Sequence, residues 1–178
     1  AYLSTNGFGG ILADDMGLGK TVQALSWLLW LQGKKKKPIP PSLVVCPKSV
    51  MDNWGMEATK FAPSLKVHVW AAGTVSELPA SVKSADLHVI NYSHLRSIGE
   101  GLQAISFLTI ILDEGQYIKN PSSQTAKTAR ALRAEHRLVL TGTPIENQAL
   151  DLWSLMSFAM PGVLGNRSQF GKLYDSKK

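Results

Sequence analysis

A glycine-rich loop between an apolar run and a helical pattern is the part of the sequence best suited to chemistry. The run 10–13 leads into Asp-Asp-Met-Gly-Leu-Gly-Lys-Thr at positions 14–21. Backbone N–H groups of such a loop surround a phosphate, and the following helix adds its positive dipole end. Lys20 would neutralise the β- and γ-phosphates, and the Thr21 hydroxyl would bind Mg²⁺. The candidate nucleotide-binding residues are Asp15, Met16, Gly17, Leu18, Gly19, Lys20 and Thr21.

The loop departs from the usual pattern G-x-x-x-x-G-K-[ST] at one position, where Asp14 replaces the first glycine. The order of strand, loop and helix still favours a phosphate site. The alternative is an ordinary glycine turn that Lys-Thr follows by chance.

Two further apolar runs end in polar residues. Residues 107–112 precede Asp113 and Glu114. Asp113 would hold Mg²⁺, directly or through water, and Glu114 would orient and deprotonate an attacking water. Residues 138–140 precede Thr141 and Thr143, whose hydroxyls would lie at the sheet edge where α/β folds bind ligands. Taken singly, the first pattern also fits a helix cap and the second an ordinary turn.

The elements that must position these residues alternate along the chain. Runs rich in Val, Ile and Leu predict strands that are buried on both faces, and helical patterns lie between several of them. This order predicts an α/β fold with a mostly parallel sheet and helices on both faces. The expected strands are 10–13, 43–46, 67–70, 87–90, 108–112 and 138–140, and the expected helices are 21–31, 49–61, 122–133 and 150–158.

Composition sets limits on the kind of protein. The 178 residues suit one domain, and one cysteine excludes a disulfide framework. The apolar run 24–31 is too short to cross a membrane, so we expect no membrane partner. The net charge is +6, but without the six lysines at 34–37 and 177–178 the basic and acidic residues are equal in number. Basicity alone is therefore weak evidence for DNA binding, and we interpret 34–37 as a solvated loop.

The expected helix 122–133 carries Lys127, Arg130 and Arg133 at helical spacing. These side chains could form a phosphate-facing stripe, but a solvated face is the favoured interpretation.

The order of motifs resembles that of the Swi/Snf-type ATPases of helicase superfamily 2, and is most similar to that of bacterial or archaeal members. The similarity covers about residues 8–165 and includes Ile-Lys-Asn-Pro at 118–121 and Gly-Thr-Pro-Ile-Glu-Asn at 142–147. The resemblance implies a DNA-dependent ATPase that moves along duplex DNA without separating its strands. It also implies ATP and Mg²⁺ as cofactors, and a cytoplasmic location, which would be nucleoid-associated in a bacterium, or a nuclear one in a eukaryote.

The resemblance assigns further roles residue by residue. Gln116 matches a position that senses nucleotide. Thr141, Gly142 and Thr143 match the motif that couples hydrolysis to DNA movement. The matches to DNA-backbone contacts are Pro47, Lys48 and Ser49, and more loosely Tyr92.

The chain also departs from the family pattern. Asp15 replaces a usual Glu, and Gly115 replaces a usual Ala. We expect residues 1–178 to form the N-terminal RecA-like lobe alone, truncated before the adenine-reading glutamine and lacking the second lobe with its arginine finger. The isolated chain would then bind ATP weakly and hydrolyse it negligibly.

Two alternative functions remain open at this stage. A strand-separating helicase lobe is disfavoured by the Ile-Lys-Asn-Pro block. A nucleotide-regulated binding module that no longer hydrolyses ATP is disfavoured because Lys20, Asp113 and Glu114 are all present.

Overall fold

The fold is a parallel sheet of six strands between two layers of helices. The computed structural model describes residues 5, 9–14, 18–142 and 149–174. Within these ranges the strand order is β1-β6-β5-β2-β4-β3, and all neighbouring strands run parallel. The strands are β1 (Gly10–Ala13), β2 (Ser42–Cys46), β3 (Val67–Val69), β4 (Leu87–Asn91), β5 (Ser106–Leu112) and β6 (Arg133–Thr141).

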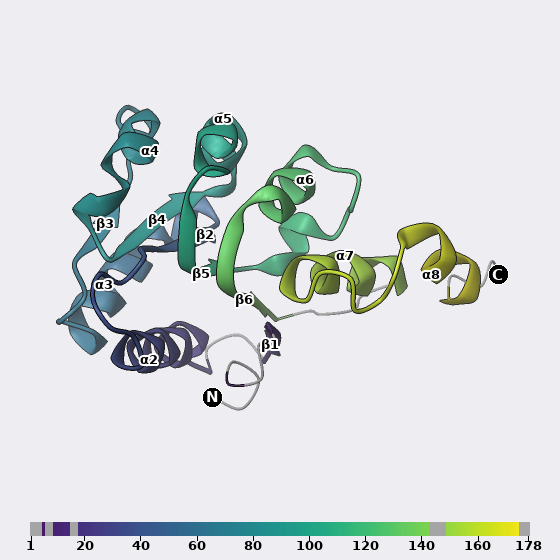
Figure 1. Cartoon of the computed structure of the whole chain (residues 1–178), viewed down its shortest axis with the longest axis horizontal. Coiled ribbons are helices and arrows are strands. Elements are labelled where there is room, and N and C mark those ends of the chain that lie inside the picture. Colours follow the sequence, from purple (N-terminus) through teal and green to yellow (C-terminus); the bar gives the residue numbers. More distant parts are fainter. Residues whose placement is uncertain (1–4, 6–8, 15–17, 143–148, 175–178) are drawn as a thin grey trace.

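Helices cover both faces of the sheet (Figure 1). One layer contains α2 (Lys20–Gly33) and α3 (Met51–Phe61), and the other contains α5 (Tyr92–Leu102), α6 (Gln124–Ala131) and α7 (Ala149–Ala159). The short α4 (Leu78–Ser81) contacts α5, and α8 (Arg167–Tyr174) packs on α7. The 3₁₀ turns are η1 (Lys48–Val50), η2 (Val75–Glu77), η3 (Val82–Ser84) and η4 (Gly115–Ile118).

Each face of the sheet has its own apolar core. Successive strand residues point to opposite faces, so Ile110 and Leu112 of β5 join one cluster and Ile111 joins the other. The α2–α3 side is centred on Trp54, and the α5–α7 side includes Phe107 and Phe158. The central strands are buried on both sides, which holds their carboxyl ends rigidly at one edge.

The α/β prediction with a mostly parallel sheet is confirmed, while several boundaries differ. β6 was expected at 138–140 but spans Arg133–Thr141, since pairing with β5 extends it over the mostly polar residues 133–137. The expected helix 49–61 divides into η1 and α3. Three helices, α4, α5 and α8, were not predicted.

The favoured solvated face of the expected helix 122–133 is confirmed for Lys127 and Arg133, which are exposed, but not for Arg130, and the helix is shorter than predicted. α6 ends at Ala131, because Leu132 takes an extended conformation and Arg133 begins β6. Arg130 is partly buried and donates to the carbonyl of Pro121 at 2.7 Å, so it does not extend into solvent. The lysines 34–37 are exposed as expected, and Lys35 pairs with Glu135. Among the described residues, no helix is long and apolar enough to cross a membrane.

Candidate functional site

The glycine-rich loop connects β1 to α2 at the carboxyl edge of the sheet. Gly19 caps α2 with a left-handed backbone (φ 70°, ψ 33°), a conformation that costs glycine little. Lys20, the first residue of α2, donates from Nζ to the carbonyl oxygen of Asp14 at 2.8 Å. The lysine ammonium is therefore held beside Asp14, directly after the end of β1. Leu18 is exposed and Thr21 is half-buried, whereas Asp15, Met16 and Gly17 lie outside the described residues.

Asp113 lies directly after β5, next to the end of β2, where its N–H donates to the carbonyl of Val45 at 2.9 Å. Its side chain is buried, and both carboxylate oxygens accept hydrogen bonds. Oδ2 accepts from the Trp54 indole at 2.8 Å, and Oδ1 accepts from the Glu114 N–H at 2.9 Å. Burial raises the pKa of the Asp113 carboxyl, and the bond from Trp54 and the charge of Lys20 act in the opposite direction. The charge of Lys20 therefore acts on Asp113.

Glu114 has a left-handed backbone, with φ 52° and ψ 62°. Among the described residues it is the one non-glycine residue with a positive φ, a conformation that costs about 1–2 kcal/mol. Such strain occurs preferentially at functional sites. The turn leaves the carboxylate half-buried, where Oε2 accepts from Gln116 Nε2 at 2.9 Å.

Thr141 at the end of β6 joins the same group. It is buried, and its hydroxyl donates to Gln116 Oε1 at 3.3 Å. The structure thus brings together the predicted residues Glu114, Gln116 and Thr141, next to Asp113. Gly142 follows at the sheet edge, and Thr143 lies outside the described residues.

The predicted DNA contacts lie after β2 and β4, beside the acidic residues. Lys48 and Ser49 are exposed, and Pro47 is half-buried. Tyr92 is buried instead: its hydroxyl donates to the backbone carbonyl of Asp113 at 2.6 Å, and its ring stacks on Tyr117 with 4.5 Å between centroids. Its hydroxyl is thus directed at Asp113.

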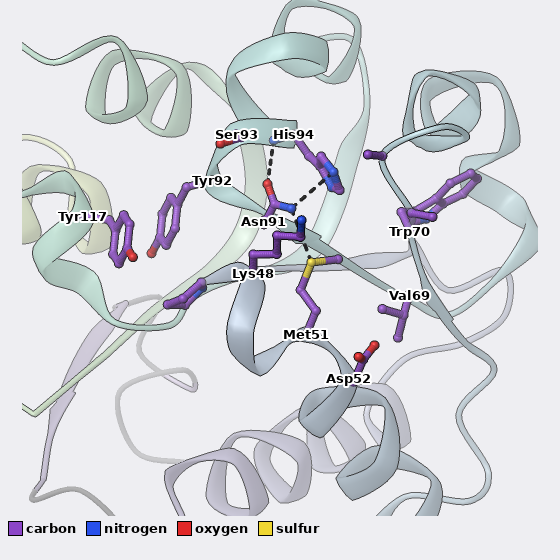
Figure 2. A pocket seen from close by; sticks show the side chains of 13 residues that line it. Lys48, Met51, Asp52, Val69, Trp70, Asn91, Tyr92, Ser93, His94 and Tyr117 are labelled. Carbon is purple, nitrogen blue, oxygen red and sulfur yellow. Dashed lines mark hydrogen bonds between the residues drawn. The ribbon is translucent and has the colours of Figure 1, made fainter.

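A cavity of about 710 Å³ opens between these strand ends (Figure 2). Asn91 is one of its lining residues. Its Oδ1 accepts from the His94 N–H and so caps α5, and its Nδ2 donates to Met51 Sδ. Burial lowers the pKa of His94, and the positive charge of Lys48 lowers it further. Lining side chains that Figure 2 labels are Lys48, Met51, Asp52, Val69, Trp70, Asn91, Tyr92, Ser93, His94 and Tyr117.

Trp54, whose indole N–H donates to Asp113, was not singled out as a site residue from the sequence. A fully buried indole needs an acceptor for its N–H, and that need was the available signal. Among the described residues, no group of three or more His, Cys, Asp or Glu side chains could hold a metal ion.

Residues 2–178 match the SNF2-related domain family. The chain belongs to this family. It is 40% identical over 182 residues to the TATA-binding protein-associated factor MOT1 of Saccharomyces cerevisiae. The alignment covers 96% of the chain and 10% of that protein. It is also 40% identical over 178 residues to an uncharacterized ATP-dependent helicase of Mycoplasma genitalium. That alignment covers 99% of the chain and 17% of that protein.

The SNF2-related fold is also shared with a solved structure. The Sulfolobus solfataricus SWI2/SNF2 ATPase core in complex with dsDNA superposes with a TM-score of 0.86 at 38% identity. The superposition covers 96% of this chain and 35% of the Sulfolobus solfataricus chain. The chain thus spans about a third of that core and less than a fifth of the two relatives above. The resemblance that the motifs indicated is confirmed.

Proposed function

We propose that this chain is the first motor lobe of an ATP-dependent double-stranded DNA translocase. One observation carries the proposal: the ends of β1, β5 and β6 place Lys20, Asp113, Glu114 and Thr141 at one edge of the sheet. Family membership and the likeness to an ATPase core in complex with dsDNA support ATP as the nucleotide and duplex DNA as the partner.

The chain's own residues suit hydrolysis of ATP. Lys20 would leave the carbonyl of Asp14 to bind the terminal phosphates. Glu114 would take a proton from the attacking water while the bond from the γ-phosphorus to the bridging oxygen breaks. Gln116 holds the Glu114 carboxylate at 2.9 Å, so it would position this base.

A magnesium ion fits the donors that are present. Mg²⁺ prefers hard oxygen ligands and retains several waters, and the hydroxyl of Thr21 and the carboxylate of Asp113 are such donors. When bound, the ion would offset negative charge on the phosphates.

Hydrolysis also needs a positive group on the far side of the γ-phosphate, typically worth about 10³ to 10⁵ in rate. Four arginines of the described chain, Arg96, Arg130, Arg137 and Arg167, donate hydrogen bonds to groups outside the predicted nucleotide site. Arg137 donates to the carbonyls of Leu132 and Phe158, and Arg133 begins β6 at the edge opposite the site. We therefore assign residues 1–178 to one RecA-like lobe that works with a second lobe.

Duplex DNA would bind through its backbone at the strand ends beyond the nucleotide. Lys48 and Ser49 are exposed beside the cavity and suit phosphate contacts, which are tolerant of sequence and sensitive to salt. A protein of this kind would act where DNA is, in the bacterial nucleoid or the eukaryotic nucleus.

Steady-state ATP hydrolysis tests this function. A longer version that contains a second lobe should hydrolyse ATP faster with duplex DNA. Glu114→Gln should lower turnover about 10²- to 10⁴-fold while nucleotide affinity is kept, because the amide cannot accept the proton of water. The 178-residue chain alone should show negligible turnover.

Two results would contradict the proposal. One is strong DNA-stimulated turnover by the chain alone, which would remove the need for a second lobe. The other is efficient separation of a duplex by the two-lobe protein, which would indicate a strand-separating helicase.

A further inference from the structure

Trp54 links the segment after β2 to Asp113. It lies in the first turn of α3, six residues beyond the exposed Lys48, and η1 leads directly into that helix. The indole is fully buried, with 0% exposure, and its N–H donates to Asp113 Oδ2 at 2.8 Å. A displacement of the Lys48 segment would therefore move the donor that holds one oxygen of this carboxylate.

Tyr92 makes a second link, from the segment after β4. Because β2 lies between β4 and β5 in the sheet, the Tyr92 side chain reaches past the end of β2. Its hydroxyl donates to the Asp113 carbonyl oxygen at 2.6 Å. The preceding residue, Asn91, lines the cavity and caps α5, so Tyr92 is fixed to the start of that helix.

The two links approach Asp113 from opposite faces of the sheet. Trp54 belongs to the core on the α2–α3 side, and Tyr92 belongs to the core on the α5–α7 side. Together with the Glu114 N–H on Oδ1, they occupy both carboxylate oxygens and the backbone carbonyl. The orientation of Asp113 therefore depends on where α3 and α5 begin.

We propose that Trp54 and Tyr92 are positioning residues that couple the DNA-facing segments at Lys48 and Asn91 to Asp113. The proposal rests on the proposed function, since it takes Asp113 as part of the nucleotide site. A ligand bound at the cavity would favour one position of the segments at Lys48 and Asn91. Because Trp54 and Tyr92 follow these segments, it would also favour one orientation of Asp113. By linkage, nucleotide at Asp113 must then change the affinity for DNA by the same factor.

The coupling ratio is the direct readout. The dissociation constant of a fluorescein-labelled DNA duplex is measured by anisotropy, with and without saturating Mg²⁺ and a non-hydrolysable ATP analogue. The wild-type ratio should be about fivefold or more, in the usual range for coupled sites. Trp54→Phe and Tyr92→Phe keep the rings and remove one donor each, and should lower the ratio to about twofold or less.

The chain offers a matched control for each variant. Trp153 in α7 donates its indole N–H to the carbonyl of Gly165 at 3.2 Å. Tyr174 in α8 is exposed and contacts Phe170. Trp153→Phe and Tyr174→Phe should keep the wild-type ratio, because the cavity lining and the hydrogen bonds to Asp113 involve neither residue.

A spectroscopic measurement on the wild-type chain covers the case in which a variant fails to fold. The chain has five tryptophans, so a ¹⁵N-labelled sample shows five indole signals, which single Trp→Phe variants assign directly or by elimination. The Trp54 signal should shift with the Mg²⁺–nucleotide analogue and also with duplex DNA alone.

The outcomes separate this inference from the proposed function. If the folded chain binds no nucleotide, the proposed function fails and the coupling falls with it. Three results, each in a chain that binds both ligands, would refute the coupling while the nucleotide site stands. The first is a wild-type ratio of one, and the second is a wild-type ratio that both variants keep. The third is a Trp54 signal that does not shift with DNA.

Discussion

The hydroxyl of Thr141 donates to Gln116 Oε1 at 3.3 Å, and Gln116 in turn donates to Glu114 Oε2 at 2.9 Å. This short chain of hydrogen bonds ties the end of β6 to the proposed catalytic base. Gln116 holds the Glu114 carboxylate, and a residue of the neighbouring strand holds Gln116. If Glu114 is the catalytic base, as the proposed function holds, Thr141 at the end of β6 would thereby influence hydrolysis.

Two substitutions of Thr141 should distinguish the effect of its hydroxyl on ATP turnover from the effect of the rest of the side chain. Thr141→Val keeps the shape and loses the donor, which should reduce ATP turnover by about tenfold, the effect of one hydrogen bond of about 1–1.5 kcal/mol. Thr141→Ser keeps the donor and should stay near the wild-type rate. Steady-state hydrolysis by the two-lobe protein measures this, and equal rates for the two variants would refute the link.

Gly115 fits its place for a steric reason. A Cβ atom at this position would lie 2.3 Å from Cγ1 of Val139 and 3.3 Å from Cδ2 of Leu155. Gly115→Ala should therefore lower the free energy of unfolding by about 1–3 kcal/mol, the usual range for overpacking. Val139→Ala in the same chain should recover part of that loss, which a double-mutant cycle in urea quantifies.

Gly73→Ala is the matched control for this steric prediction, because nothing lies within 4 Å of a Cβ there. Additive effects of Gly115→Ala and Val139→Ala would contradict the predicted clash. The result also bears on the family pattern, since alanine is usual at the position of Gly115 and would need a smaller neighbour on β6.

Acid should destabilise the fold through His88. Its Nδ1 accepts from the Trp70 indole at 2.9 Å, and its Nε2 lies 2.7 Å from the carbonyl of Val82, which together fit the neutral ring with a proton on Nε2. Burial lowers the pKa of His88 below its ordinary value near 6.5. Below pH 6.5 the unfolded chain therefore binds more protons than the folded one, and stability falls as pH decreases toward the lowered pKa.

Thermal melts between pH 7.5 and 5.5 measure this effect. The wild-type melting temperature should fall across that range, and His88→Gln should flatten part of the fall. His94 and His136, whose pKa values burial also lowers, would add to the fall, whereas Asp113, whose pKa burial raises, would act in the opposite direction. A melting temperature that rises as the pH is lowered would contradict the assignment.

The sequence predicted the parallel sheet because its strands are continuous apolar runs, such as 108–112, that leave few alternatives. It predicted Lys20, Asp113 and Glu114 because their roles follow from local order: a strand, a loop, then a helix or a turn. It could not place the first half of β6, since residues 133–137 (Arg-Ala-Glu-His-Arg) are mostly polar and become a strand only by pairing with β5.

The same limit explains the missed contacts at Asp113. Trp54 and Tyr92 lie 59 and 21 residues before it, and only the order of β4, β2 and β5 brings them together. The strained backbone of Glu114 is equally invisible to a motif, because nothing local demands a positive φ at a glutamate.

The most direct test of the central claim is a titration of a fluorescent ATP analogue into the folded 178-residue chain, with and without Mg²⁺. The account predicts saturable binding that strengthens with Mg²⁺ and is lost in Lys20→Ala. Lys172→Ala, a substitution in α8, serves as the control and should bind like the wild type. Binding that survives in Lys20→Ala, or no binding by the folded wild-type chain, would contradict the nucleotide site on which the proposed function depends.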